Sequence, residues 1–232
     1  MAWQRAEQIA GWFTEAQARS LWQAAKRVLP PHVIVEIGSH EGRSTTILAA
    51  AAGDGVQIYA VDPFDDPTWG GGTEAWHHFH NNLRSAIDRD QVHPLRRLSH
   101  DAGREWERGA VGLLLIDGAH DYPTVLGDID LWTPFVPVGG TVLIHDAYSS
   151  LGVTRAVLRR FLRNGEFLYR GSAGSLAHFD RVVSRGPRLA QTARMVGRLG
   201  WFSRNIVIKV ALRQGWDWAL PVLGHQGREM PI

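Results

Sequence analysis

Short apolar runs alternate with amphipathic segments along the first 180 residues. The apolar runs predict strands at 33–37, 57–61, 91–98, 111–116, 141–144, 167–169 and 176–179. The run at 111–116 reads VGLLLI, a composition typical of a central strand buried on both faces. Strands that alternate with helices predict an α/β fold with a doubly wound, seven-stranded, mostly parallel sheet that ends in a hairpin.

Helix signals fall between most of these strands. Thr14-x-x-Gln17 has the form of a capping box and predicts an N-terminal helix that ends near residue 28, before a proline pair. Apolar residues at helical spacing predict further helices at 43–52, 123–132 and 150–163. A last amphipathic stretch at 187–213 predicts a C-terminal helical extension.

Residues just after the strands are the candidates for function, because doubly wound sheets bind ligands there. Gly38 and Gly42 follow the first strand, in a turn that lets the backbone approach a ligand closely. The spacing is neither G-x-G-x-x-G nor a Walker A motif, so an ordinary strand–helix turn is an alternative. Asp62 ends the second strand, where a carboxylate can accept both ribose hydroxyls or, alternatively, cap a helix. Together these features favour a nucleoside-containing cofactor.

Four ionisable residues follow the fourth and fifth strands. Asp117 and His120 come after one strand, and His145 and Asp146 come after the other. These strands are expected to be neighbours, so their ends should converge. Two carboxylates and an imidazole suit a divalent cation such as Mg²⁺, with His120 as a base beside it. The alternative is a polar pocket without a metal, in which both histidines are neutral and hydrogen-bonded.

Four motifs, in this order along the chain, resemble a known family. They are Glu36-x-Gly38-x-x-x-Gly42, Val61-Asp62-Pro63-Phe64, Asp117-Gly118-Ala119-His120-x-Tyr122 and Gly139-Gly140 followed by His145-Asp146. Over about residues 10–180 the chain resembles class I S-adenosylmethionine-dependent methyltransferases. Within them it is similar to the metal-dependent O-methyltransferases of sugars and small molecules that carry an Asp-Gly-x-His signature. The resemblance implies a Rossmann-like methyltransferase domain at 1–180, followed by a basic extension at 181–232 that is not an independent domain.

The resemblance also implies roles for single residues. The residues that would bind S-adenosylmethionine, with Asp62 on the ribose and Ser99 and His100 near the adenine, are Glu36, Gly38, Ser39, Gly42, Ser44, Asp62, Ser99, His100 and Asp117. Mg²⁺ would be held by Asp117, His145 and Asp146, and His120 would be the general base. Relatives carry a carboxylate at position 145, and catechol-type relatives carry Asn where this chain has Ala147.

The reaction implied by the resemblance transfers a methyl group from S-adenosylmethionine to a hydroxyl of a sugar or glycoside. Mg²⁺ would orient and acidify the hydroxyl, and His120 would remove its proton. The expected partner is therefore a small-molecule or oligosaccharide acceptor. Two alternatives remain: a phenolic natural product as the acceptor, and a non-catalytic cofactor- or membrane-binding module.

An aromatic, glycine-rich segment lies between Asp62 and the third strand. Gly70, Gly71 and Gly72 stand between Trp69 and Trp76, which predicts a lid that closes over the substrate. The alternative is a surface loop followed by a helix whose aromatic side chains pack in the core.

Composition bears on the compartment and the partners. The chain has no Cys, which excludes disulfides and favours a reducing compartment. It has no signal-peptide pattern and no run of 18 apolar residues, so we expect a cytoplasmic protein. We also expect a homodimer, and no nucleic-acid partner because no reading motif is present.

Charge is unevenly distributed along the chain. The formal net charge is +2, but residues 181–232 carry +7 and the preceding residues carry −5. Three interpretations of the basic extension stay open. It packs on the core or on a second subunit, it lies on an anionic membrane surface, or it recognises an acidic or lipid-linked substrate.

Overall fold

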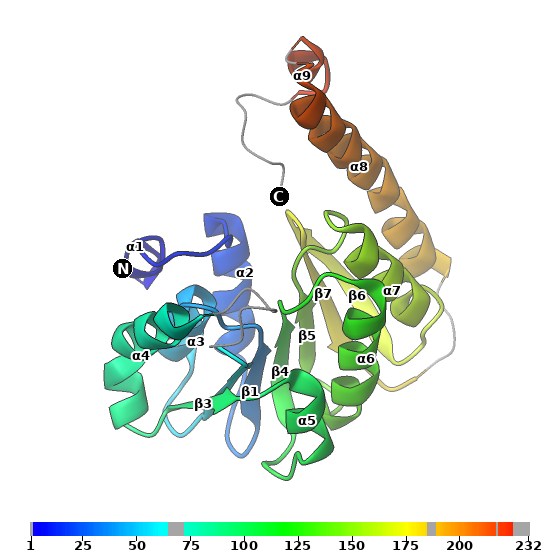
Figure 1. Cartoon of the computed structure of the whole chain (residues 1–232). Helices are drawn as coiled ribbons and strands as arrows, with labels where there is room; N and C mark the ends of the chain where they lie inside the picture. The colour runs from blue at the N-terminus through cyan, green and yellow to red at the C-terminus, as the bar shows by residue number, and fades with distance from the viewer. Residues whose placement is uncertain (1, 65–71, 185–188, 217, 225–232) are drawn as a thin grey trace.

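A twisted sheet runs through the centre of the molecule (Figure 1). The computed structural model of the chain describes residues 2–64, 72–184, 189–216 and 218–224. In this described part, seven strands lie in the order β3-β2-β1-β4-β5-β7-β6, and β7 alone runs antiparallel to its neighbours. The strands are β1 (Val33–Ile37), β2 (Ile58–Asp62), β3 (Val92–Arg96), β4 (Val111–Ile116), β5 (Thr141–Ile144), β6 (Phe167–Ala173) and β7 (Leu176–Arg181). The predicted doubly wound, seven-stranded, mostly parallel sheet is confirmed.

Helices cover both faces of this sheet. One face is covered by α1 (Ala2–Ala6), α2 (Glu15–Ala25), α3 (Arg43–Ala51) and α4 (Thr73–Asp88). The other is covered by α5 (Ser99–Arg104), α6 (Tyr122–Trp132), the 3-10 turn η2 (Thr133–Phe135), α7 (Leu151–Phe161) and the first part of α8 (Leu189–Gln214). The short helix α9 (Ala219–Val222) follows at the far end of α8 (Figure 1). Each face therefore buries its own apolar core.

Local sequence signals account for most of these boundaries. Thr14 caps α2 through a capping box, in which its backbone N–H donates to Gln17 Oε1 at 2.8 Å. The strands predicted at 33–37, 111–116 and 141–144 have the observed bounds, whereas β6 and β7 extend beyond the predicted hairpin. Helices α1 and α5 were not predicted, because each is only a turn or so long and carries little periodic signal.

Backbone pairing brings the strand ends together. The N–H groups of Gly38, Asp117 and His145 donate to the carbonyls of Val61, Ile37 and Ile116 on the neighbouring strands, at 2.8 to 3.0 Å. The loops after β1, β2, β4 and β5 consequently start side by side at one edge of the sheet.

The C-terminal extension is attached to the sheet at the start of α8. Gln191 is buried, and its amide donates to the carbonyls of Phe161 and Phe167 at 3.1 and 3.0 Å. Its Oε1 accepts the N–H of Tyr169 at 3.2 Å. Met195 of the next turn is also buried in the core. Beyond this point α8 extends toward α9 (Figure 1), and Lys209 near its end still contacts Ser149 of the body.

The helices of the described residues were compared with the length and hydropathy that a membrane span requires. No described helix meets both requirements.

Candidate active site

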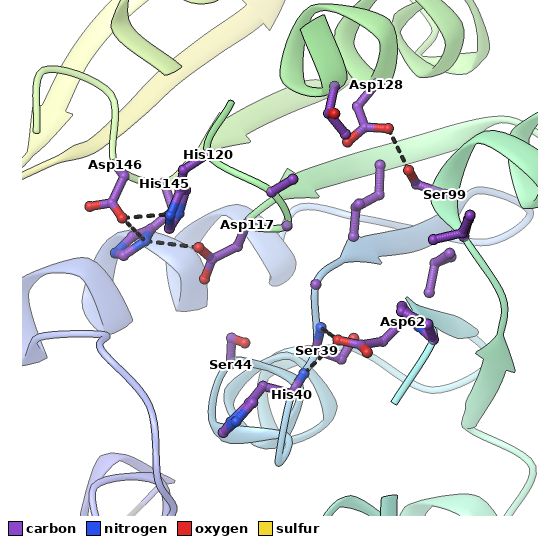
Figure 2. A pocket seen from close by; sticks show the side chains of 18 of the residues that line it. Ser39, His40, Ser44, Asp62, Ser99, Asp117, His120, Asp128, His145 and Asp146 are labelled. Carbon is purple, nitrogen blue, oxygen red and sulfur yellow. Dashed lines mark hydrogen bonds and ion pairs between the residues drawn. The ribbon is translucent and has the colours of Figure 1, made fainter. Parts of the chain in front are cut away.

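A cavity of about 980 Å³ opens at the carboxyl ends of the parallel strands (Figure 2). A cavity of this size can enclose a whole small ligand. The predicted site residues that line it are Gly38, Ser39, Ser44, Asp62, Ser99, His100, Asp117, His120, His145 and Asp146. Two predicted cofactor residues, Glu36 and Gly42, are not part of this wall.

The loop after β1 approaches the loop after β4 very closely. Gly38 has φ +85°, and a Cβ at this position would lie 2.2 Å from the carbonyl oxygen of Asp117. Asp62 holds the same loop from the β2 side: its Oδ2 accepts the N–H groups of Ser39 and His40 at 2.8 and 2.9 Å. Its Oδ1 accepts the N–H of Phe64 at 2.7 Å. Asp62 thus shapes the wall and faces the cavity, and its ribose role stays a prediction.

Glu36 and Gly42 support the loop from behind. Glu36 is fully buried and accepts the hydroxyl of Thr45 at 2.5 Å. Burial raises the pKa of Glu36 to about 7, although hydroxyl donors near it act in the opposite direction. At Gly42, φ is +89° and a Cβ would lie 2.5 Å from a methyl group of Leu83 on α4. Both residues therefore fix the conformation of the loop from positions outside the cavity.

The opposite end of the cavity is formed by α5 and α6. Ser99 donates its hydroxyl to Asp128 Oδ1 at 2.5 Å, and Asp128 is almost completely buried (Figure 2). Burial raises the pKa of Asp128 to about 6, partly offset by the Ser99 hydrogen bond. His100 lies beside this pair on the wall. The predicted adenine end thus contains a buried carboxyl group that the sequence analysis did not identify.

The four ionisable residues after β4 and β5 form one cluster (Figure 2). His145 Nδ1 lies 2.9 Å from Asp117 Oδ1 and 3.7 Å from Asp146 Oδ2. The same Asp146 oxygen lies 3.1 Å from His120 Nε2. Asp146 has φ +54°, a left-handed conformation that costs energy and that the tight turn after β5 imposes. Asp146 therefore joins the two histidines.

The two histidines differ in environment. His145 is buried, and its ring stacks on Phe13 at 4.7 Å between centroids. Burial acts to lower the pKa of His145, but Asp117 and Asp146 together outweigh it and raise the pKa. His120, by contrast, is half exposed on the cavity wall. Of the two histidines, His120 is therefore the more accessible to an incoming ligand.

A glycine of α7 fixes the position of the His120 loop. A Cβ on Gly152 would lie 2.2 Å from the carbonyl oxygen of His120. The hydroxyl of Ser150 donates to the same carbonyl at 3.4 Å. The first turn of α7 thus packs directly against the backbone that carries His120.

The segment before α2 forms one further wall of the cavity. Arg43 of α3 donates to the carbonyls of Ala6, Glu7 and Gly11, which holds this segment in place. Trp12 lines the cavity with 69% of its side chain exposed, and its ring centroid lies 5.5 Å from that of His40. A large aromatic surface therefore faces the open part of the site.

The structure describes only part of the segment predicted to form a lid. Trp69, Gly70 and Gly71 lie outside the described residues. Trp76 belongs to α4, where its ring contacts those of Phe64 and Phe79 at 5.2 and 6.5 Å. It packs on the apolar core rather than on the cavity wall. For Trp76 the alternative holds: a helix with aromatic side chains that pack inward.

Comparisons with known proteins bear on the identity of this site. Residues 35–147 match the family model described as a methyltransferase domain. The chain has the Rossmann-like fold of methyltransferases. The match spans the loops after β1, β2, β4 and β5, and so includes the predicted cofactor motifs and the ionisable cluster.

The relatives of this chain are distant. It is 30% identical over 183 residues to the uncharacterized protein y4gI of Sinorhizobium fredii, which covers 75% of this chain. This chain spans only 20% of the length of that curated relative.

Solved structures share the methyltransferase fold. A Corynebacterium glutamicum protein has a TM-score of 0.62 at 14% identity, over 79% of this chain and 91% of its own. CalS11, a TDP-rhamnose 3'-O-methyltransferase of calicheamicin biosynthesis, has 0.53 at 17% identity, over 72% and 80%. Cofactor-bound Rv0187 from MTB has 0.56 at 16% identity, over 78% and 86%. These likenesses show a common fold.

Three residues of the candidate site were missed by sequence reasoning. Trp12 and Phe13 precede the Thr14 helix cap, and a pair of aromatic residues beside a cap was a usable signal. Asp128 sits among the apolar positions of a helix that includes Val125, and a carboxylate on such a face was a second signal. Each of these residues lies far along the chain from the other site residues, so its place in the site was not recognised from the sequence.

The buried carboxyl of Asp128 leads to a testable pH effect. In the unfolded chain an Asp titrates near 3.9, so the folded chain binds more protons between about pH 4 and pH 6. Its stability should fall as the pH rises through this window. Asp128→Asn keeps an acceptor for Ser99 and removes the charge. We expect the variant to exceed the wild type in free energy of unfolding by roughly 1–3 kcal/mol at pH 7.5 and to match it near pH 4.

Urea denaturation at both pH values measures this difference. Asp88→Asn on the exposed side of α4 is the matched control and should show no such pH dependence. A variant no more stable than the wild type at pH 7.5 would contradict the assigned cost of burying the Asp128 carboxylate.

Proposed function

We propose that this chain is an S-adenosylmethionine-dependent O-methyltransferase that acts on a hydroxyl of a sugar or glycoside, with His120 as the general base. The observation that carries the proposal is the contact of His120 with Asp146 on the wall of the cavity, 3.1 Å apart. A histidine oriented by a carboxylate is a common arrangement for removing a proton near neutral pH.

The walls of the cavity fit S-adenosylmethionine. Gly38 has no side chain, so its backbone is accessible from the cavity at a point where a Cβ would collide with the loop after β4. Asp62 faces the cavity with its two carboxylate oxygens. Among the described residues, Oδ1 accepts only the N–H of Phe64 and so has a lone pair left for a ribose hydroxyl, whereas Oδ2 already accepts two backbone N–H groups. When bound, the cofactor supplies a methyl group on a positively charged sulfur.

The proton of the acceptor hydroxyl goes to His120. With Nε2–H donated to Asp146, the lone pair of His120 Nδ1 is free to accept this proton. The C–S bond then breaks as the O–C bond forms, and the neutral thioether product leaves. Asp146 stabilises the positive charge that His120 acquires, and the remaining catalysis is the positioning of the oxygen against the methyl group.

The three predicted Mg²⁺ ligands do not fit the ion in this arrangement. His145 Nδ1 is directed at the carboxylates of Asp117 and Asp146 instead of sharing a coordination point with them. Its Nε2 is buried, and no group of three or more such side chains within the described ranges could hold a metal ion. Mg²⁺ also prefers oxygen ligands and retained water. The proposed mechanism therefore relies on the histidines and takes no step through a metal.

The sugar acceptor is supported by Trp12. Its exposed ring borders the cavity, and the adjacent Phe13 stacks on His145 of the ionisable cluster. An exposed aromatic ring of this kind suits the apolar face of a pyranose. The structural likeness to a TDP-rhamnose 3'-O-methyltransferase points in the same direction.

A methyl-transfer assay with purified full-length chain tests this proposal. The acceptors are sugar nucleotides and glycosides on one side and phenols on the other, each assayed in EDTA and in added Mg²⁺. We expect at least about tenfold higher kcat/KM for one of the sugars than for any phenol. We also expect the same rate in EDTA as in Mg²⁺, because the base and its partner are both side chains.

The possible failures of this assay are distinct. Turnover of phenols alone would reject the sugar acceptor, and activity that EDTA abolishes and Mg²⁺ restores would reject the histidine-only mechanism. Cofactor binding without turnover of any acceptor would favour a non-catalytic module.

A further inference from the structure

The C-terminal helix α8 carries positive charge along its whole length. Its 26 residues include Arg194, Arg198, Arg204, Lys209 and Arg213 and no Asp or Glu. The structure gives three of these cations uncharged partners. Arg198 donates to the carbonyl of Gly174 and lies over the rings of Tyr148 and Trp201. Arg204 donates to the carbonyls of Leu223 and Gly224 and to Asn205 Oδ1, and Lys209 donates to Ser149. None of the five forms an ion pair with a carboxylate in the part of the chain that the structure describes. Their charge is therefore not neutralised within the described molecule.

An exposed apolar stripe runs along the same helix. Val196, Val207 and Val210 are exposed and lie 11 and 3 residues apart, a spacing that puts them on one helical face. The inward face is different, with Met195 and Ile208 both completely buried. The outward face of α8 is thus apolar rather than charged.

Exposed aromatic and aliphatic side chains continue beyond the end of α8. Trp216, Trp218 and Val222 are exposed by 49%, 76% and 83%. They lie at the tip of the extension, where α8 meets α9, far from the sheet (Figure 1). Tryptophan at the end of a basic amphipathic helix is typical of a segment that sits at the interface between lipid and water.

We propose that α8 and α9 dock this chain onto an anionic lipid surface. At 3.6 residues per turn, Arg204 and Arg213 lie roughly a quarter turn to either side of the valine stripe. In this position their charges reach the lipid headgroups when the stripe enters the interface. The exposed tryptophans insert at the same level.

A second copy of the chain fits this surface less well. Two α8 helices that packed through the valine stripe would bring Arg204 and Arg213 of both copies close together. Like charges at these flanking positions oppose pairing. An anionic surface complements the same charges, which is why a lipid headgroup layer is the preferred occupant.

The docked extension would lie close to the catalytic loops. Lys209 donates to the carbonyl and hydroxyl oxygens of Ser149 at 3.0 and 3.1 Å, and Ser149 belongs to the turn that carries Asp146. Docking therefore brings the active-site turn near the lipid surface. The inference itself does not depend on the nature of the methyl acceptor.

Co-sedimentation of the full-length chain with vesicles tests the docking directly. The vesicles contain phosphatidylcholine alone or with about 30% phosphatidylglycerol. We expect at least tenfold stronger partition onto the anionic vesicles, and loss of most of this binding when the salt is raised to about 0.5 M. Methylation activity is not part of this readout.

Two sets of variants separate charge from insertion. Arg213→Glu, and Trp216→Ser with Trp218→Ser and Val222→Ser, change exposed side chains only, and each should reduce binding at least tenfold. The matched controls are Arg159→Glu, which makes the same change of net charge on α7, and Leu29→Ser with Val138→Ser, which removes exposed apolar side chains elsewhere. Both controls should bind like the wild type.

Three results would overturn the proposal. One is the absence of binding to anionic vesicles at low salt. Another is binding that survives the charge reversal at Arg213. The third is a dimer in light scattering that Val207→Ser with Val210→Ser dissociates, which would assign the stripe to a second copy. Circular dichroism of each variant shows whether the fold is intact.

Discussion

Replacing His120 by Ala is expected to lower kcat by about 10²–10⁴-fold and to leave the affinity for S-adenosylmethionine unchanged. His120 is half exposed on the cavity wall, and its Nε2 contacts Asp146 Oδ2 at 3.1 Å, so its other ring nitrogen is free for the acceptor proton. The loss of the imidazole removes the base without disturbing the Gly38 and Asp62 walls. Steady-state kinetics at saturating cofactor and calorimetric cofactor binding measure the two quantities separately.

Two companion variants sharpen this experiment. Asp146→Asn should also lower kcat, because the amide no longer favours the His120 tautomer that presents Nδ1 to the acceptor. His77→Ala, on the exposed side of α4, should behave like the wild type. If His120→Ala kept the wild-type kcat, the assignment of His120 as the base would be wrong.

Replacing Gly38 by Ala is expected to cost about 2–5 kcal/mol of stability and to abolish cofactor binding. The left-handed φ of +85° contributes roughly 1–2 kcal/mol to this cost. The new Cβ would lie 2.2 Å from the Asp117 carbonyl, and moving the β4 loop to relieve that contact adds about 1–3 kcal/mol. Urea denaturation and calorimetry with S-adenosylmethionine provide the two measurements.

Gly139→Ala is the matched control for the backbone effect. Gly139 has φ +91°, close to the φ of Gly38, but a Cβ there would meet open space. This variant should lose only about 1–2 kcal/mol and should bind the cofactor normally. Equal losses in the two variants would mean that conformational strain alone, and not the close approach to Asp117, makes Gly38 necessary.

The strands and their order along the chain could be predicted because their signals are local. The apolar runs of β1, β4 and β5 set these strands to the residue, and the Thr14 capping box set the start of α2. The short helices α1 and α5 could not be predicted, because packing on the rest of the molecule stabilises them more than their own periodicity does. Trp76 was misjudged for a related reason, since an aromatic residue in a polar segment does not reveal which way its helix faces.

The candidate site could likewise be predicted only in part. The positions after the strands could be predicted because the carboxyl ends of parallel strands meet at one edge, and Asp117, His120, His145 and Asp146 do form one cluster. Which of them pair could not be predicted, because the sequence does not show in which direction each side chain points. The same holds for Glu36, whose carboxylate accepts the Thr45 hydroxyl and lies outside the cavity wall.

The sequence by itself determined the α/β class, the strand order along the chain and the strand ends that carry chemistry, since all of these depend on periodicity and neighbouring residues. The tertiary structure alone decided that Trp12 and Asp128 share one cavity with His120, and that α8 turns a valine stripe outward. Contacts between residues far apart in the chain depend on packing and on side-chain direction. Neither packing nor side-chain direction can be inferred from the pattern of neighbouring residues.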